Sequence, residues 1–272
     1  MTTKAAGAVS GLYRYPVKSM LGETVEQVEI DGLGVVGDRA QALVDVETGR
    51  VATAKQPRWW RELLRCRAAT VSGGITVTLP DGGEHGSLAV DDLLSEILGR
   101  PVRMSEQRAD GAEIERPEPE EVLEHGVDAD LDAPPLEIAM GTPGGRFVDY
   151  APVHLVTTAT LDEVGVETLR YRPNIVVRTP EGTPPFVENS WLGRRLTVGG
   201  VELEGTLPTP RCSVPTLEHG GLPRSKEALR TPAELNKVWV SLLEANLPCV
   251  GMYAAVITPG VVRAGDAVEI LD

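Results

Sequence analysis

Short runs of alternating or β-branched residues, separated by turns, recur along this chain and limit the folds that it can adopt. They cover 25–30, 75–79, 174–178, 195–198, 201–204, 253–257 and 267–271. Helical periodicity is confined to 91–98, 160–164 and 232–245, where a Thr-Pro pair marks the expected start of the last helix. Many short strands with few helices predict a mainly β (α+β) protein, built as a barrel or sandwich and not as a doubly wound sheet.

Acidic residues are concentrated in one segment of the chain. The net charge is −14, and residues 106–137 contain twelve Asp or Glu and two Arg, for a net charge of −10 in that segment. The segment also holds four prolines and few large apolar residues. We therefore expect a solvated or mobile acidic loop that keeps the protein soluble, in preference to a docking tail. The negative charge argues against general nucleic-acid binding.

The cysteines and the N-terminus suit a cytoplasmic protein. Cys66, Cys212 and Cys249 lie far apart with no CxxC pair, which suits a reducing cytosol. The first residues lack the apolar core of a signal peptide, and no run approaches the ~20 apolar residues that a membrane span needs. We expect a soluble, cytoplasmic protein without a membrane span.

One cysteine stands out by its neighbours. In the stretch 207–216, Cys212 follows Arg211 and lies among three prolines, which restrict the backbone on both sides. A nearby guanidinium favours the thiolate, the form that ligates metals and attacks electrophiles. A buried structural cysteine is the alternative, and the residues alone leave the two interpretations level. Cys66 and Cys249 are predicted to be core cysteines.

Three further places offer groups that suit an anion such as a phosphate. Lys18 and Ser19 supply an ammonium and a hydroxyl, Arg39 follows a glycine-rich turn, and Arg172 and Asn174 flank Pro173. Each taken alone is more often an ordinary surface residue. The chain has no GxGxxG fingerprint, P-loop, HExxH or GxSxG motif, so the usual nucleotide, zinc-hydrolase and serine-hydrolase routes are not indicated.

Taken in order, these motifs resemble a known family. The motifs are Tyr15-Pro-Val-Lys-Ser19, Gly37-Asp-Arg39, the stretch 152–161, Arg172-Pro-Asn174 and Arg211-Cys212. They occur in the order seen in the MOSC (molybdenum cofactor sulfurase C-terminal) family. The layout is similar to members with an N-terminal β-barrel module, which include the mitochondrial amidoxime-reducing component and its bacterial relatives. One difference is Thr209, which stands where animal members have a second cysteine.

The resemblance implies an architecture and a site. We expect an N-terminal β-barrel module at 1–105, an acidic connecting loop at 106–149 and a β-barrel MOSC domain at 150–272. A cleft between two β-rich lobes would hold a molybdopterin-type molybdenum cofactor, with Cys212 as the metal ligand and catalytic residue. The implied cofactor-binding residues are Lys18, Ser19, Arg39, Thr157, Thr158, Arg172, Asn174, Arg211 and Cys212. A soft thiolate suits such a metal, and scattered cations suit its phosphate.

The implied activity is reduction of N-hydroxylated compounds such as amidoximes or hydroxylamines by a molybdenum oxidoreductase. Electrons would come from a separate donor protein, because the chain shows no iron–sulfur, flavin or nicotinamide motif. Asp149 and Glu188 are candidate proton donors, neither of them assigned. One alternative is a carrier that holds a persulfide or the cofactor on Cys212, and another is a metal-free binding module. Pyridoxal phosphate binding is a further expectation of the resemblance.

Overall fold

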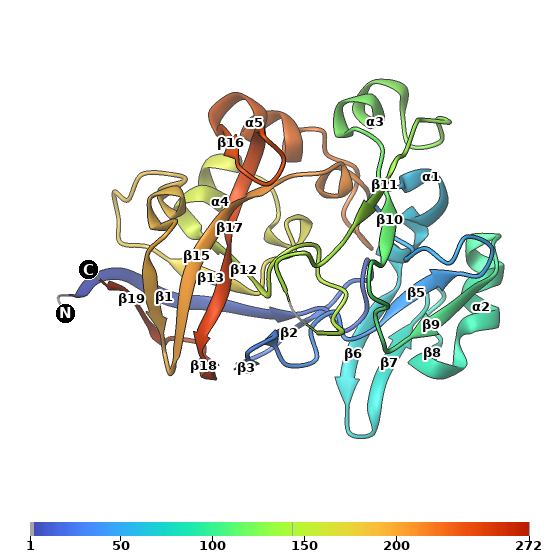
Figure 1. Cartoon of the computed structure of the whole chain (residues 1–272), viewed down its shortest axis with the longest axis horizontal. Coiled ribbons are helices and arrows are strands. Elements are labelled where there is room, and N and C mark those ends of the chain that lie inside the picture. The colour runs from blue at the N-terminus through green and yellow to red at the C-terminus, as the bar shows by residue number, and fades with distance from the viewer. Residues whose placement is uncertain (1–2, 143, 272) are drawn as a thin grey trace.

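The chain forms two groups of strands that lie side by side, with the acidic segment above their junction in the view of Figure 1. The computed structural model describes residues 3–142 and 144–271. Within them the larger group closes into a seven-stranded barrel, in the order β12-β13-β1-β19-β14-β15-β17, with β17 pairing back to β12. These strands are β1 (Thr3–Arg14), β12 (Val153–Thr157), β13 (Ile175–Arg178), β14 (Arg195–Val198), β15 (Val201–Pro210), β17 (Ala245–Thr258) and β19 (Ala267–Leu271). The predicted mainly β fold with a barrel is confirmed.

Alternating burial builds the barrel core. In β14 and β19 every second residue is buried, so Leu196, Val198, Val268 and Ile270 point inward. The short strands β12 and β13 pair in parallel and are buried on both faces. Their outer face packs against α4 (Thr158–Val164) and α5 (Glu227–Leu235).

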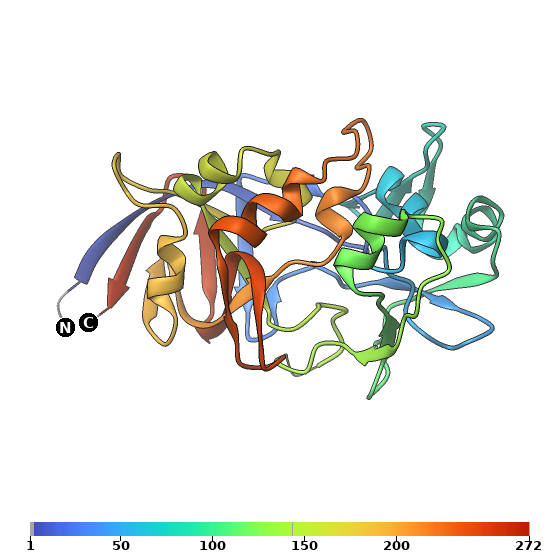
Figure 2. The same ribbon diagram turned by 90° about the horizontal axis from the view of Figure 1, so that it is seen from above.

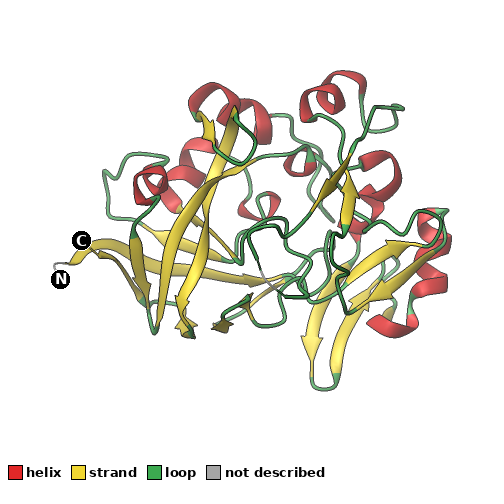
Figure 3. Cartoon of the chain, viewed as in Figure 1, coloured by secondary structure: helices red, strands yellow, loops and turns green. Residues whose placement is uncertain are grey.

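The smaller lobe has its own core. Strand β5 pairs with β9, and β7 lies between β6 and β8 and pairs with both. The helices of this lobe are α1 and α2. Their bounds are β5 (Ala42–Asp45), β6 (Arg67–Val71), β7 (Gly74–Thr78), β8 (Glu84–Gly86), β9 (Val102–Ser105), α1 (Pro57–Trp60) and α2 (Asp91–Leu98). Apolar side chains such as Leu63, Val77 and Leu94 fill the space between them. Figure 3 shows strands in both lobes and mostly loop where the lobes meet.

The first residues of the chain belong to the larger lobe. Strand β1 pairs with β13 and β19, and β3 (Gln27–Asp31) pairs with β4 (Gly34–Val35) and with β18 (Gly260–Arg263). The short β2 (Glu23–Thr24) pairs with the end of β1. Both ends of the described chain therefore lie together, as Figure 2 shows from above. The division at 105 and 150 stays a prediction, but a cut along the sequence does not separate the two lobes.

The acidic segment is not a loop without structure. It contains the hairpin β10 (Glu113–Glu115) with β11 (Pro135–Glu137), and between them α3 (Pro119–His125). Ile114 and Val122 are fully buried. The acids also meet arginines of the smaller lobe, as in the 2.7 Å contact of Arg50 with Glu115. The composition of the segment did not indicate this secondary structure, because the arginines that pair with its acids are distant in sequence.

One predicted helix was wrong. The segment 232–245 contains the end of α5, the strand β16 (Lys237–Val240) and its turn into β17. Pro232 lies inside α5 and has no N–H to offer the carbonyl of Ala228, four residues earlier. The Tyr171 hydroxyl donates to that carbonyl at 2.9 Å instead, so the helix tolerates its proline. The helix predictions at 91–98 and 160–164 correspond to α2 and α4.

Candidate functional site

A cavity at the junction of the lobes collects most of the residues singled out from the sequence. We call it the polar cavity. Seven of the predicted residues line it: Lys18, Ser19, Arg39, Arg172, Asn174, Arg211 and Cys212. They come from four separate segments, which the barrel and the smaller lobe bring together. Lys55, Asp149, His154, Tyr171 and Tyr253 also line it.

Cys212 is the accessible thiol of the three. It lies just after β15 and before a 3₁₀ helix at Val214–Thr216, and it is half-buried, whereas Cys66 and Cys249 are fully buried. Burial raises the pKa of Cys66 to about 11 and that of Cys249 to about 12, so both are inert thiols. The stretch before Cys212 differs from the expected stiff loop. Residues 207–210 are the end of β15, held by pairing with β17.

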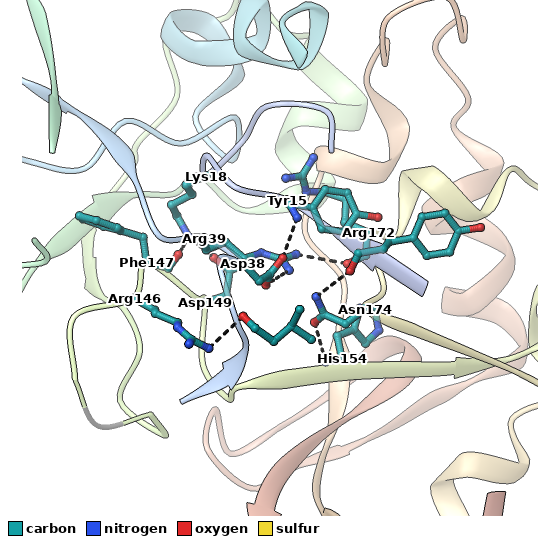
Figure 4. Close-up of polar contacts among 12 residues, drawn as sticks. Tyr15, Lys18, Asp38, Arg39, Arg146, Phe147, Asp149, His154, Arg172 and Asn174 are labelled. Carbon is teal, nitrogen blue, oxygen red and sulfur yellow. Dashed lines mark hydrogen bonds and ion pairs between the residues drawn. The ribbon is translucent and has the colours of Figure 1, made fainter. Parts of the chain in front are cut away.

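Two arginines flank one aromatic ring beside Cys212's cavity. The guanidinium carbons of Arg39 and Arg172 lie 4.7 and 4.4 Å from the centre of the Tyr15 ring. Asp38 holds this arrangement, because it ion-pairs with Arg39 and accepts from the Tyr15 backbone N–H at 2.7 Å. Arg39 also donates to the carbonyl oxygen of Arg172 at 3.2 Å. Figure 4 shows these groups converging, which fixes two positive charges close together.

Backbone strain gathers at the same place. Of the six non-glycine residues with positive φ in the described part of the chain, Ser19, Arg39 and Arg172 line the polar cavity, at 66°, 45° and 55°. Such conformations cost roughly 1–3 kcal/mol each and persist where surrounding contacts impose them. The Ser19 hydroxyl accepts from the Ala54 N–H at 3.0 Å, and Arg172 donates to the Met20 carbonyl at 2.7 Å. Strain of this kind is typical of a binding site.

The charge of the cavity is positive although the protein is acidic. Lys18, Lys55, Arg39, Arg172 and Arg211 line it together with the carboxylate of Asp149. Burial lowers the pKa of Lys18 to about 8 against the opposing pull of Asp149, 2.6 Å away. Burial alone would raise the pKa of Asp149, but Lys18 and Lys55 hold it well below its usual value. Asp149 is therefore ionised at neutral pH.

Two guanidinium nitrogens in this cavity lack hydrogen-bond partners. Nη2 of Arg172 and Nε of Arg211 are buried, and neither has an acceptor among the described residues. Burial and the neighbouring Arg39 together lower the pKa of Arg172 to about 10, which still leaves it charged at pH 7. Buried cationic donors without acceptors are costly. An anion bound between these arginines would satisfy both.

Most of the remaining polar groups make hydrogen bonds within the wall of the polar cavity. The His154 ring contacts the Val250 carbonyl at 3.2 Å, and burial lowers its pKa to about 3, so the ring is neutral. It lies so close to Gly251 that a Cβ there would come within 2.6 Å of Nε2. Asn174 accepts from the His154 backbone N–H at 3.1 Å and thereby joins two strands. Arg211 donates to the Tyr171 carbonyl at 3.1 Å.

Two predicted site residues lie elsewhere. Thr157 caps α4, and its hydroxyl donates to the buried carboxyl of Glu188 at 2.9 Å. The Thr158 hydroxyl lies 3.4 Å from that of Thr179. Neither threonine lines the polar cavity, and burial raises the pKa of Glu188 in a separate buried cluster. Of the two candidate proton donors, only Asp149 faces the cavity, and its low pKa makes it a base in place of an acid.

Sequence comparison places this site in a family. Residues 145–269 match the model of the MOSC domain, and residues 6–115 match the MOSC N-terminal beta barrel domain. The chain belongs to the MOSC family. The polar cavity of this MOSC protein draws Lys18, Ser19 and Arg39 from the N-terminal match and Arg172, Arg211 and Cys212 from the MOSC match. The family is associated with the molybdenum cofactor.

Curated relatives of the MOSC protein carry one name. It is 26% identical to human mitochondrial amidoxime-reducing component 1, over 97% of this chain and 83% of the relative. The mouse protein of the same name is 25% identical over 97% of this chain and 82% of that relative. Rat mitochondrial amidoxime reducing component 2 is 33% identical over 45% of this chain and 37% of the relative. The YUAD protein from Bacillus subtilis is 12% identical with a TM-score of 0.41, over 99% of this chain and 97% of that chain.

Lys55, Tyr171 and Tyr253 are among the lining residues of the MOSC protein's cavity that the sequence reasoning did not assign to the site. Lys55 and Tyr253 lie in stretches without a motif, and only the fold brings them beside Cys212. Tyr171 directly precedes the Arg172 motif, so its neighbourhood was available as a signal. Among the described residues, no helix has the length and apolarity to cross a membrane.

Proposed function

We propose that the chain is a molybdenum-cofactor oxidoreductase that removes oxygen from N-hydroxylated substrates. The observation that carries the proposal is an accessible thiol, Cys212, at the edge of a cavity lined by five cations, two of which have unpaired buried nitrogens. An anionic cofactor with a phosphate and a thiolate-binding metal fits these groups. The names of the relatives, amidoxime-reducing components, support the substrate class.

The protein's own residues would hold and orient the cofactor. Cys212 would ligate molybdenum, while Arg39, Arg172 and Arg211 would bind the phosphate and pterin with Lys18 and Ser19. The guanidinium groups of Arg39 and Arg172 stack on the Tyr15 ring and are therefore already oriented before the cofactor binds. This reduces the entropy lost on binding. The bound metal supplies the two-electron chemistry. The remaining cavity residues would position the substrate and exclude water.

The reaction consumes two electrons and two protons for each N–O bond broken, and the oxygen leaves as water. A separate donor protein would supply the electrons. Asp149 is ionised, so it would accept a proton before passing one on. Burial raises the pKa of Tyr253, which keeps its phenol protonated at neutral pH. Tyr253 lines the cavity beside Cys212 and is the group that we propose to hold a proton there.

One experiment tests the assignment against its alternative. The protein would be produced in a host that makes the cofactor, and molybdenum per chain would be measured together with oxygen removal from an amidoxime by a reduced dye. Molybdenum with turnover supports the proposal. Molybdenum, or a persulfide on Cys212, without turnover on any N-hydroxylated compound would favour a carrier, which the accessible thiol also suits. Protein that lacks molybdenum in such a host contradicts the cofactor assignment.

A further inference from the structure

A second cavity is also lined by Cys212. We call it the apolar cavity. It shares five residues with the polar cavity: Lys55, Asp149, Arg211, Cys212 and Tyr253. The two cavities therefore adjoin at the residues around Cys212. The strained arginines Arg39 and Arg172 line only the polar cavity.

Away from this shared wall the lining becomes apolar. Leu136 and Met140 come from the acidic segment and the residues after it, Leu207 comes from β15, and Leu242 and Leu243 come from the turn between β16 and β17. The rings of Tyr150 and Tyr253, 6.0 Å apart, lie on the same lining. Apart from the shared wall, Arg116 and Glu137 are the charged residues of this lining. The cavity is thus polar at Cys212 and apolar along its length.

The apolar lining continues beyond this cavity. A further hollow shares Arg116, Leu136 and Leu243 with it and adds Pro134, Pro135, Ala245 and Leu247, with Glu118 as its one additional charged residue. The two hollows together run between the β10–β11 hairpin and the β16–β17 hairpin. An exposed Met140, at 60% of its full accessibility, and Leu242, at 39%, border this route. Solvent-exposed apolar side chains gathered along one hollow are typical of a ligand-binding surface.

We propose that the apolar cavity and its continuation bind the body of the substrate, and that the substrate is an uncharged N-hydroxylated compound with an elongated apolar chain. This inference rests on the proposed function. The polar head would lie at Lys55, Arg211 and Tyr253 beside Cys212. The apolar chain would follow Leu136 and Leu243 outward. A charged chain would lose hydration beside Leu136, Leu243 and Leu247. The charges of this lining, Arg116, Glu118 and Glu137, are of mixed sign, so a charge on the chain would meet repulsion as well as attraction.

The geometry gives a chain-length test. A homologous series of alkyl amidoximes, from acetamidoxime to octanamidoxime, keeps the head and varies only the body. Binding is measured by calorimetry without a reductant, so that no turnover is required. Each methylene that leaves water should tighten binding by up to about fourfold until the hollow is filled. Equal affinities along the series would overturn the proposal.

Two surface variants and one control locate the effect. Met140→Glu and Leu242→Glu should each lower the ratio of octanamidoxime affinity to acetamidoxime affinity by tenfold or more. Leu235→Glu is the control, because Leu235 is 51% exposed on α5 and lines neither hollow. All three lie at exposed positions, and thermal unfolding checks each fold. A ratio that falls equally in the control, or in no variant, would overturn the assignment.

The binding series also separates this inference from the proposed function. If the protein turns over no N-hydroxylated compound but still prefers longer chains in a Met140-dependent way, the apolar site stands and the reaction is wrong. If amidoximes turn over with the same KM at every chain length and in both variants, the reaction stands and the apolar site is wrong.

Discussion

The barrel interior is built from the barrel strands and the polar cavity largely from segments that adjoin their ends, and the two bury opposite kinds of groups. Strand β15 places Leu203 in the barrel core and then leads to Arg211 and Cys212 at the cavity. The barrel core holds fully buried apolar side chains in ordinary strand geometry. The polar cavity holds buried cations on strained backbone. Stability and ligand binding are therefore assigned to separate residues, and substitutions should fall into two classes.

The largest effect is expected at Cys212. Cys212→Ala should abolish activity and weaken molybdenum retention while leaving the unfolding temperature near that of the wild type, because the side chain is small, half-buried and only borders a minor core cluster. Activity, molybdenum content and thermal unfolding measure this. Cys66→Ala is the matched control. It should retain activity but lose roughly 1 kcal/mol or more of stability. An active Cys212→Ala would remove the metal-ligand assignment.

A substitution in the barrel core should lower stability without lowering cofactor binding. Leu196→Ala removes a fully buried side chain from the barrel and should lower the free energy of unfolding by about 2–5 kcal/mol. Chemical denaturation measures the loss. Cofactor bound per folded molecule should not change. A parallel loss of cofactor affinity would mean that the barrel and the cavity are not separable.

Next in size is the loss of one buried arginine. Arg172→Ala should weaken cofactor binding about 10- to 100-fold, since a charge-assisted hydrogen bond to a buried anion contributes about 1.5–3 kcal/mol. Arg178→Ala is the matched control because Arg178, six residues later at the end of β13, has an exposed side chain. Molybdenum and pterin content are the readouts. Equal content in the two variants would place the anion elsewhere.

A pH series tests Lys18, whose pKa is lowered from 10.5 to about 8. The ammonium is present below pH 8 and is lost above it, so cofactor affinity should fall by up to about tenfold between pH 7 and pH 9. The unfolded chain binds this proton more tightly, so the stability of the cofactor-free protein should rise over about pH 8–10.5. Lys18→Arg should flatten both trends. Opposite or absent trends would show that Lys18 is not the titrating group.

The last prediction concerns the helix that contains Pro232. Tyr171→Phe leaves the buried Ala228 carbonyl without a donor and should cost about 1–3 kcal/mol. Adding Pro232→Ala supplies a backbone N–H for that carbonyl, so the double variant should recover part of the loss. Denaturation of the four proteins in this cycle gives the coupling. Additive effects would mean that the hydroxyl does not replace the missing helix bond.

The sequence predicted the fold class from local signals and the neighbourhood of Cys212 from the family resemblance. Alternation in 195–198 and 267–271 marked strands, and the resemblance grouped Lys18, Arg39 and Arg172, which the fold brings together. Thr157 and Thr158 lay in a family motif, but Thr157 caps α4 and contacts Glu188, and Thr158 contacts Thr179. A motif names a segment, and the backbone direction decides which of its side chains face the cavity.

Other features could not be predicted because they depend on distant contacts. Tyr253 reaches the cavity through the pairing of β17 with both β12 and β15. The acidic segment folds against arginines such as Arg50 and Arg61, which composition cannot pair with their acids. His219 precedes two glycines in the sequence, yet it is 2% exposed and its ring contacts the Leu217 carbonyl. The helix predicted at 232–245 failed where cross-strand pairing outweighed local periodicity.

The pairing of β1 with β19 has a consequence for biosynthesis. Thr3 lies opposite Leu271, so the barrel lacks one strand until residues 267–271 have left the ribosome. Until then β1 has no partner on that edge, and the arginines on both sides of the cavity are not held in place. Cofactor loading should thus follow the synthesis of β19. Nascent chains stalled with β19 still in the exit tunnel should capture no cofactor, and chains stalled after β19 has left the tunnel should; capture by the first set would contradict this order of events.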